Sequence, residues 1–169
     1  ILVTAKSGRD LILIGRKDGT VIAIDADRHD KAVWERKLGR GSIQGGVQWG
    51  MTAEPGRVYV PIADMADSSD GKVYTEPPHP GLYALDTSTG ALVWSSPADD
   101  RCKGEKACDP GIMAAVTSIP GAVFAGHLDG RILAYDAATG KVTWEYDSRQ
   151  DVVTLSTLHA AKGLEWPHV

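Results

Sequence analysis

Two cysteines, Cys102 and Cys108, are the first residues whose type and spacing could do chemistry. They are the only cysteines in the chain, and they stand six positions apart in a segment rich in charge and glycine. Structural zinc would need four ligands, and neither His79 nor His127 stands at the spacing of a zinc finger. A local disulfide, a redox pair and a chance occurrence are all compatible with this spacing. We favour the disulfide, which indicates an oxidising compartment and stabilises such a small loop by roughly 2 to 3 kcal/mol.

A repeated pattern surrounds the cysteines and must supply the elements that position them. Residues 134–144 read AYDAATGKVTW, and residues 84–94 read ALDTSTGALVW with the same internal spacing. Residues 23–34 read AIDADRHDKAVW, a looser copy with one extra residue. The runs around these copies lack the 3.6-residue periodicity of helices, and a period near 50 built from short strands is typical of a propeller or a solenoid. We interpret the copies as blades.

Turn residues divide each copy into strands. Asp129-Gly130, between two apolar runs, predicts a hairpin with a type I′ turn, which needs positive φ at both central residues. The Asp136 side chain is expected to accept hydrogen bonds from backbone amides two residues on, and Gly140 to supply a left-handed residue. Residues 122–146 therefore predict a three-stranded antiparallel meander.

The whole chain is predicted to be all-β, with three blades at about residues 8–38, 41–96 and 110–148. The first blade is expected to contain only its outer strands, and residues 45–51 and 111–117 are predicted as the inner strands of the other two. Irregular segments at 63–80 and 96–110 interrupt the strands, and such insertions often carry function. Propellers close with about four to eight blades. We therefore expect this chain, which begins without Met or a signal peptide, to be a piece of a longer protein.

Composition excludes several functional classes. The 43% hydrophobic and 24% charged residues are typical of a soluble globular protein. The net charge of −4 provides no basic footprint for nucleic acid or anionic lipid. No apolar run approaches the roughly 18 residues that a membrane span requires.

The repeat resembles the tryptophan-docking motif of eight-bladed quinoprotein dehydrogenases, which use pyrroloquinoline quinone (PQQ). Residues 45–51 (GGVQWGM), 102–111 (C-x5-CDPG) and 114–121 (AAVTSIPG) resemble the polyvinyl-alcohol dehydrogenase branch, and the match runs from about residue 8 to 150. The resemblance implies a PQQ- and calcium-dependent enzyme that oxidises a secondary or polymeric alcohol by hydride transfer to the quinone. It also implies an electron acceptor such as cytochrome c and a periplasmic or secreted location. The fragment alone is expected to be inactive, and the alternative is a propeller that only scaffolds protein partners.

The resemblance assigns tryptophans to two roles. Trp49 matches the residue on whose flat face the quinone stacks, and the small Gly50 beside it allows close approach. The other interpretation of Trp49 is a core aromatic. Trp34, Trp94 and Trp144 match the docking tryptophans, which are structural and lie between blades.

The resemblance also assigns two carboxylates. Asp64 corresponds to a calcium ligand at the end of a strand, and calcium prefers oxygen ligands. Its partner ligands are expected to lie outside this chain, and the alternative is a solvated loop aspartate. Asp109 corresponds to the general base that takes the proton of the alcohol, although Asp99 and Asp100 stand nearby. His127, a lone histidine in a hairpin, is expected to be exposed, and the alternative is that it approaches the propeller axis.

Residues 151–169 form an atypical tail. The run TLHAAKGLE at 157–165 resembles a conserved motif of UvrD/Rep-type DNA helicases. A helicase also needs a phosphate-binding loop, and G-x-x-x-x-G-K-[ST] does not occur in the chain. A helicase fusion is therefore the third and weakest hypothesis for function.

Overall fold

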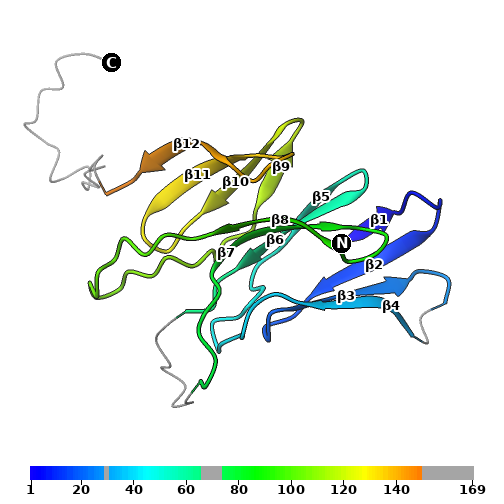
Figure 1. The fold of residues 1–169 in the computed structure, drawn as a ribbon, viewed down its shortest axis with the longest axis horizontal. Helices are drawn as coiled ribbons and strands as arrows, with labels where there is room; N and C mark the ends of the chain where they lie inside the picture. The colour runs from blue at the N-terminus through cyan, green and yellow to red at the C-terminus, as the bar shows by residue number, and fades with distance from the viewer. Residues whose placement is uncertain (29–30, 66–73, 150–169) are drawn as a thin grey trace, which may run out of the picture.

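The computed structural model describes residues 1–28, 31–65 and 74–149, and all regular structure within these ranges is strand. The strands form three four-stranded antiparallel sheets, each made of strands that follow one another in the sequence (Figure 1). The first sheet contains β1 (Leu2–Thr4), β2 (Asp10–Gly15), β3 (Thr20–Asp25) and β4 (Ala32–Lys37). The second contains β5 (Thr52–Glu54), β6 (Arg57–Ile62), β7 (Gly81–Asp86) and β8 (Leu92–Pro97). The third contains β9 (Thr117–Ile119), β10 (Ala122–Gly126), β11 (Arg131–Asp136) and β12 (Val142–Asp147). The all-β prediction is confirmed, whereas the helicase-like tail lies outside the described residues.

The prediction of the edge strands was wrong in two respects. The first sheet is not limited to outer strands, because β1 pairs with β2 and completes it. Residues 45–51 and 111–116 are not strands; β5 and β9 follow them instead. The reason is that these segments form hydrogen bonds between sheets. The Gly46 N–H donates to the Lys17 carbonyl in the β2–β3 turn of the first sheet, and the Gly46 carbonyl accepts from the Ala63 N–H directly after β6 of the second.

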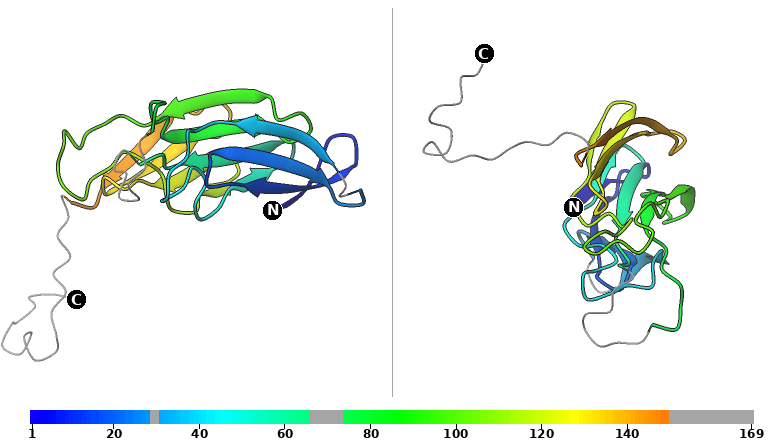
Figure 2. Two further views of the ribbon diagram at one scale, coloured as in Figure 1. Left: turned by 90° about the horizontal axis from the view of Figure 1, so that it is seen from below. Right: turned by 90° about the vertical axis from the view of Figure 1, so that its left-hand side faces the viewer.

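The hydrophobic core lies between the sheets, in two clusters. One joins the first sheet to the second, with Leu13, Val21 and Val60 among its buried residues. The other joins the second sheet to the third, with Leu82 and Val123. Figure 2 shows the sheets lying one against the next. The central strands of the second sheet, β6 and β7, are buried on both faces and read as continuous apolar runs, whereas β2 alternates between buried and exposed residues.

Tryptophan docking joins neighbouring sheets by the same contact twice. The Trp34 Nε1–H donates to the Thr87 carbonyl at 2.9 Å, and the Trp94 Nε1–H donates to the Ala137 carbonyl at 3.0 Å. Each indole lies over the glycine of the next sheet's Thr-Gly turn, which leaves no room for a Cβ. An alanine stands opposite each tryptophan on the neighbouring strand, and the register shifts directly after it in all three sheets.

The turns use the predicted residues with one correction. The Asp136 Oδ1 accepts from the N–H groups of Ala138 and Thr139 at 3.1 and 2.8 Å, as expected. The Asp129-Gly130 hairpin is not type I′, because only Gly130 has positive φ. Its loop has three residues. The His127 N–H donates to the Arg131 carbonyl and the Gly130 N–H donates to the His127 carbonyl, as in a type I turn followed by a left-handed glycine.

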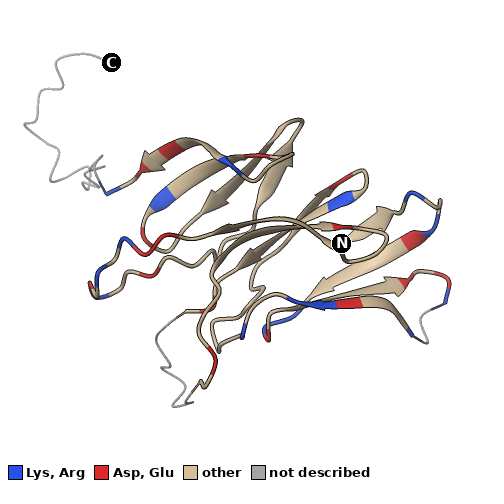
Figure 3. Cartoon of the chain, in the orientation of Figure 1, with Lys and Arg blue, Asp and Glu red and all other residues tan. Residues whose placement is uncertain are grey.

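The outward faces of the first and third sheets expose apolar side chains, among them Ile14, Ile132 and Trp144. Charged residues of both signs are interspersed and lie mainly in loops and at strand ends (Figure 3). The described part of the chain contains no helix that is long and apolar enough to cross a membrane.

Candidate functional site

The connection between the second and third sheets, residues 98–116, lies beside the segments that carry the predicted site residues. The Val116 N–H donates to the Gly50 carbonyl at 3.4 Å, next to Trp49. Farther back in the same connection, the Ile112 N–H donates to the Ile62 carbonyl at 3.2 Å, and a Cβ at Gly111 would meet the Ala63 carbonyl oxygen at 2.2 Å. The part of the connection that follows Asp109 therefore contacts the segment next to Trp49 and the segment next to Asp64.

Trp49 presents its indole to the surface, with 68% of the residue exposed. The indole of Trp49 is therefore open to contact in this chain, and its role stays a prediction. A flat exposed π face beside a residue without a side chain is the arrangement that a planar cofactor needs for stacking. Trp49 and Gly50 therefore fit PQQ.

Asp64 is placed differently from a calcium ligand. Its Oδ2 accepts from the N–H groups of Arg40 and His79 at 2.8 and 3.1 Å, and its Oδ1 accepts from Gly41 N–H at 3.0 Å. Only 1% of the residue is exposed, and a Cβ at Gly39 would lie 2.6 Å from both carboxylate oxygens. The carboxylate is enclosed by backbone, so it fits neither a calcium ligand nor the alternative of a solvated loop aspartate. It ties together the segments at 39–41 and 79.

Other metal ligands do not gather around Asp64. Across residues 1–28, 31–65 and 74–149, no group of three or more His, Cys, Asp or Glu side chains could hold a metal ion. Calcium prefers six to eight oxygen ligands. The predicted partner ligands lie outside this chain, so the enclosure of the Asp64 carboxylate, and not this absence, is what argues against a calcium role.

Asp109 is buried at the end of the connection's loop, with 7% exposed. Its Oδ1 accepts from the Gly111 N–H at 2.8 Å. The two nearby candidates differ, because Asp99 and Asp100 are exposed and Asp100 accepts from the Cys102 N–H at 2.9 Å as a turn residue. Among the three, Asp109 is the carboxylate held inside the fold.

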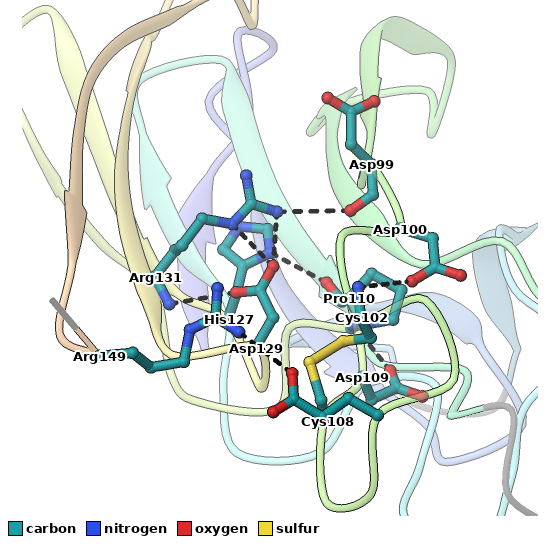
Figure 4. The surroundings of a disulfide bond; sticks show 12 residues. Asp99, Asp100, Cys102, Cys108, Asp109, Pro110, His127, Asp129, Arg131 and Arg149 are labelled. Carbon is teal, nitrogen blue, oxygen red and sulfur yellow. Dashed lines mark hydrogen bonds and ion pairs between the residues drawn. A yellow bond between two sulfur atoms is a disulfide. The ribbon is translucent and has the colours of Figure 1, made fainter.

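The predicted disulfide is present and closes this loop. Cys102 and Cys108 are bonded, with their Cα atoms 5.5 Å apart. Figure 4 shows the bond directly beside Asp109 and Pro110. The disulfide therefore fixes the segment immediately before the candidate base.

Sequence reasoning missed a polar cluster on the β10–β11 hairpin. His127 is buried, not exposed as expected, and its Nδ1 and Nε2 lie 2.9 Å from the Pro110 carbonyl oxygen and 2.8 Å from the Tyr135 hydroxyl. Burial lowers the pKa of His127 below its ordinary value of 6.5. Arg131 and Asp129 form a buried ion pair at 2.6 Å, and the Arg131 Nη2 also donates to the Asp99 carbonyl at 3.4 Å.

Glu145 of β12 links Arg131 of this cluster to Arg101 of the disulfide loop. The Arg101 Nη1 lies 2.6 Å from the Glu145 Oε1, and the Arg131 Nη1 lies 3.8 Å from the Glu145 Oε2. The signal in the sequence was the HLDGR run at 127–131, in which opposite charges flank a glycine between two apolar strands. The cluster attaches the disulfide loop to the third sheet.

Comparison with known proteins places the chain in a family. The family model PQQ_2, described as "Outer membrane protein assembly factor BamB", matches residues 17–163. A polyvinylalcohol dehydrogenase from Pseudomonas sp. is 41% identical over 150 residues, which are 88% of this chain and 22% of the relative. The polyvinylalcohol dehydrogenase of Sphingopyxis sp. (strain 113P3) is 37% identical over 158 residues, 92% of this chain and 23% of the relative. The quinohemoprotein alcohol dehydrogenase ADH-IIG of Pseudomonas putida is 41% identical over 83 residues, 48% of this chain and 12% of the relative.

Solved structures show the same fold. BamB from Moraxella catarrhalis has a TM-score of 0.55 and 23% identity, over 83% of this chain and 35% of that chain. The quinohemoprotein alcohol dehydrogenase of Comamonas testosteroni has a TM-score of 0.53 and 23% identity, over 80% of this chain and 19% of that chain. The chain thus spans between a fifth and a quarter of the two polyvinylalcohol dehydrogenases. Because the family model covers most of the residues that build the three docked sheets, the chain belongs to the PQQ_2 family of β-propeller proteins.

Proposed function

We propose that this chain is part of a PQQ-dependent dehydrogenase that oxidises a secondary or polymeric alcohol. The observation that carries the proposal is the 41% and 37% identity to two polyvinylalcohol dehydrogenases over 88% and 92% of the chain. The exposed indole of Trp49 beside the connection that carries Asp109 supports it. We include no metal ligand in the proposal, because the Asp64 carboxylate is enclosed by backbone N–H groups.

Trp49 provides the flat face on which the quinone stacks, and Gly50 leaves that face accessible. PQQ, when bound, accepts the electrons and hydrogen removed from the alcohol carbon. Asp109 acts as the general base that takes the hydroxyl proton, a role worth about 10²- to 10⁴-fold in rate. The Gly111 N–H fixes one oxygen of that carboxylate, so the direction in which the other oxygen can accept a proton is restricted.

Further blades would complete the molecule. The exposed apolar faces of the first and third sheets are the surfaces that such blades would cover, and Trp144, 51% exposed, is the tryptophan that would dock on the next one. The disulfide favours an oxidising compartment, hence a periplasmic or secreted protein. One relative is a "1-butanol dehydrogenase (cytochrome c)", and we propose a cytochrome c as electron acceptor here as well.

A scaffold propeller is the second candidate function, favoured by the family description and by the structural likeness to BamB. PQQ titration of the full-length protein separates the two, with tryptophan fluorescence and dye-coupled oxidation of polyvinyl alcohol as readouts. The dehydrogenase predicts saturable quenching that Trp49→Ala weakens, and a loss of about 10²- to 10⁴-fold in kcat for Asp109→Asn. Absence of quenching and of turnover, with and without added calcium, would favour the scaffold.

A further inference from the structure

We propose that His127 is a positioning residue that orients the Asp109 carboxylate through the Pro110–Gly111 peptide. This inference rests on the base role proposed above for Asp109. His127 and Asp109 bind opposite ends of this one peptide unit.

The geometry of that peptide carries the inference. The His127 Nδ1 lies 2.9 Å from the carbonyl oxygen of Pro110, and the Asp109 Oδ1 accepts at 2.8 Å from the N–H of Gly111. This carbonyl and this N–H belong to the same planar, trans peptide unit, so they point in opposite directions. Rotation of the peptide plane about its flanking bonds would change both hydrogen bonds together. His127 therefore fixes the orientation of the donor that holds the carboxylate.

The two hydrogen-bond partners of the His127 imidazole determine which of its ring nitrogens carries the proton. A carbonyl oxygen can only accept, so the Nδ1 facing Pro110 carries a proton. Burial disfavours the charged ring, so the Nε2 is unprotonated and accepts from the Tyr135 hydroxyl at 2.8 Å. Tyr135 is almost fully buried in β11, which makes the far side of the ring rigid.

The hairpin that carries His127 also holds this segment by its backbone. The Leu128 N–H donates to the Gly111 carbonyl at 2.9 Å, and the His127 N–H donates to the Arg131 carbonyl at 2.8 Å. Figure 4 shows His127, Asp129 and Arg131 on one side of the disulfide loop, facing Pro110 and Asp99. The third sheet thus holds residues 110–111, whose peptide in turn orients the Asp109 carboxylate.

Two substitutions separate positioning from packing. In His127→Asn the amide nitrogen takes the place of Nδ1 and keeps the donor to Pro110, whereas in His127→Gln it takes the place of Nε2 and loses that donor. Both are tested in the full-length protein by hydrogen exchange of the Gly111 amide and by kcat and KM for polyvinyl alcohol. Tyr59→Phe is the control, because it removes a buried hydroxyl that bonds to Glu54 and the Ala137 carbonyl, away from this loop.

The expected result is a contrast between the two His127 variants. In His127→Gln the Gly111 amide hydrogen should exchange at least tenfold faster than in wild type. Its kcat should fall by about 10- to 100-fold, the size of effect that a small misplacement of a reacting group causes. Its KM should change by less than about twofold. His127→Asn and Tyr59→Phe stay near wild type in both measurements. Equal exchange and equal kcat in the Asn and Gln variants would overturn the proposal.

Two further measurements distinguish failure of the positioning role of His127 from failure of the base role of Asp109. If wild type turns over but Asp109→Asn does so equally well, Asp109 is not the base and the positioning role falls with it, while the exchange rates still report whether His127 holds the peptide. Selective ¹⁵N labelling of histidine tests the wild-type protein without any variant. A protonated Nδ1 for His127 is expected, and an Nε2–H tautomer would overturn the inference even if neither variant folds.

Discussion

Replacing Gly140 by alanine should separate the second and third sheets, because Trp94 occupies the space that a Cβ would need. A Cβ built at Gly140 meets the Trp94 ring atoms Cε3, Cδ2 and Cζ3 at 2.4, 2.7 and 2.9 Å. The indole is 8% exposed and donates to the Ala137 carbonyl at 3.0 Å, so it is enclosed and held in place. Gly140→Ala must therefore displace the ring or the turn.

The expected magnitude has two parts. Gly140 has a φ of +73°, and an L-residue in this region costs about 1–2 kcal/mol. Full loss of a buried tryptophan side chain costs about 3–5 kcal/mol, which is an upper limit for displacing Trp94. We expect Gly140→Ala to lower the free energy of unfolding by about 3–5 kcal/mol in total.

Gly121→Ala is the matched control. Gly121 has a φ of +86°, and nothing lies within 4 Å of a Cβ built there. Only the backbone cost of about 1–2 kcal/mol should appear in this variant. Equilibrium urea unfolding of the full-length protein, followed by near-ultraviolet circular dichroism, measures both. Equal destabilisation by the two substitutions would refute the argument that the tryptophan needs the glycine.

Two further predictions concern the polar cluster of the third sheet. Since burial lowers the pKa of His127, the unfolded chain binds the proton more readily. The stability from this group is complete above about pH 6.5 and is lost as the pH falls through the folded-state pKa. The urea midpoint should decrease between pH 7.5 and 5.5, and less so in His127→Asn. Arg131→Met should cost about 3–5 kcal/mol because it leaves Asp129 charged and buried. Arg131→Met with Asp129→Asn should recover most of that loss, because asparagine removes the buried charge and keeps the oxygen that accepts from the backbone N–H of residue 131. Arg101→Met, at an exposed pair, should change the unfolding free energy by less than about 1 kcal/mol.

The fold could be predicted where short-range signals decide the structure. The turn after Asp136 is local, since its carboxylate bonds amides two and three residues away. The repeated tryptophan indicated docking, and the contacts of Trp34 and Trp94 with the next sheet's turn agree with it. The turn type at Asp129-Gly130 was wrong because the dipeptide fits more than one hairpin loop, and hydrogen bonding between His127 and Arg131 selects the longer one.

The structure of residues 45–51 and 111–116 could not be predicted, because the backbone groups that bond to these segments are remote in sequence. Gly46 bonds to Lys17 on one side and Ala63 on the other, so a segment with strand-like composition serves as a bridge between sheets. The partners of Asp64, whose residue type is one that binds metals, are also remote in sequence. Its three N–H donors come from residues 40, 41 and 79, and only the folded chain brings them to the carboxylate. Residue type defines what a side chain can bind, whereas the surrounding backbone decides what it does bind.

The candidate site and the docking contacts depend on the same junction. Gly111 packs against Ala63 of the second sheet and is held by Leu128 of the third, so Asp109 takes its position from both sheets at once. Trp94 joins those two sheets at another part of the same interface. A shift of one sheet relative to the other would therefore move the Gly111 amide relative to Pro110 and His127. Docking of Trp94 therefore contributes to the position of Asp109, the proposed general base, without lying next to it in the sequence.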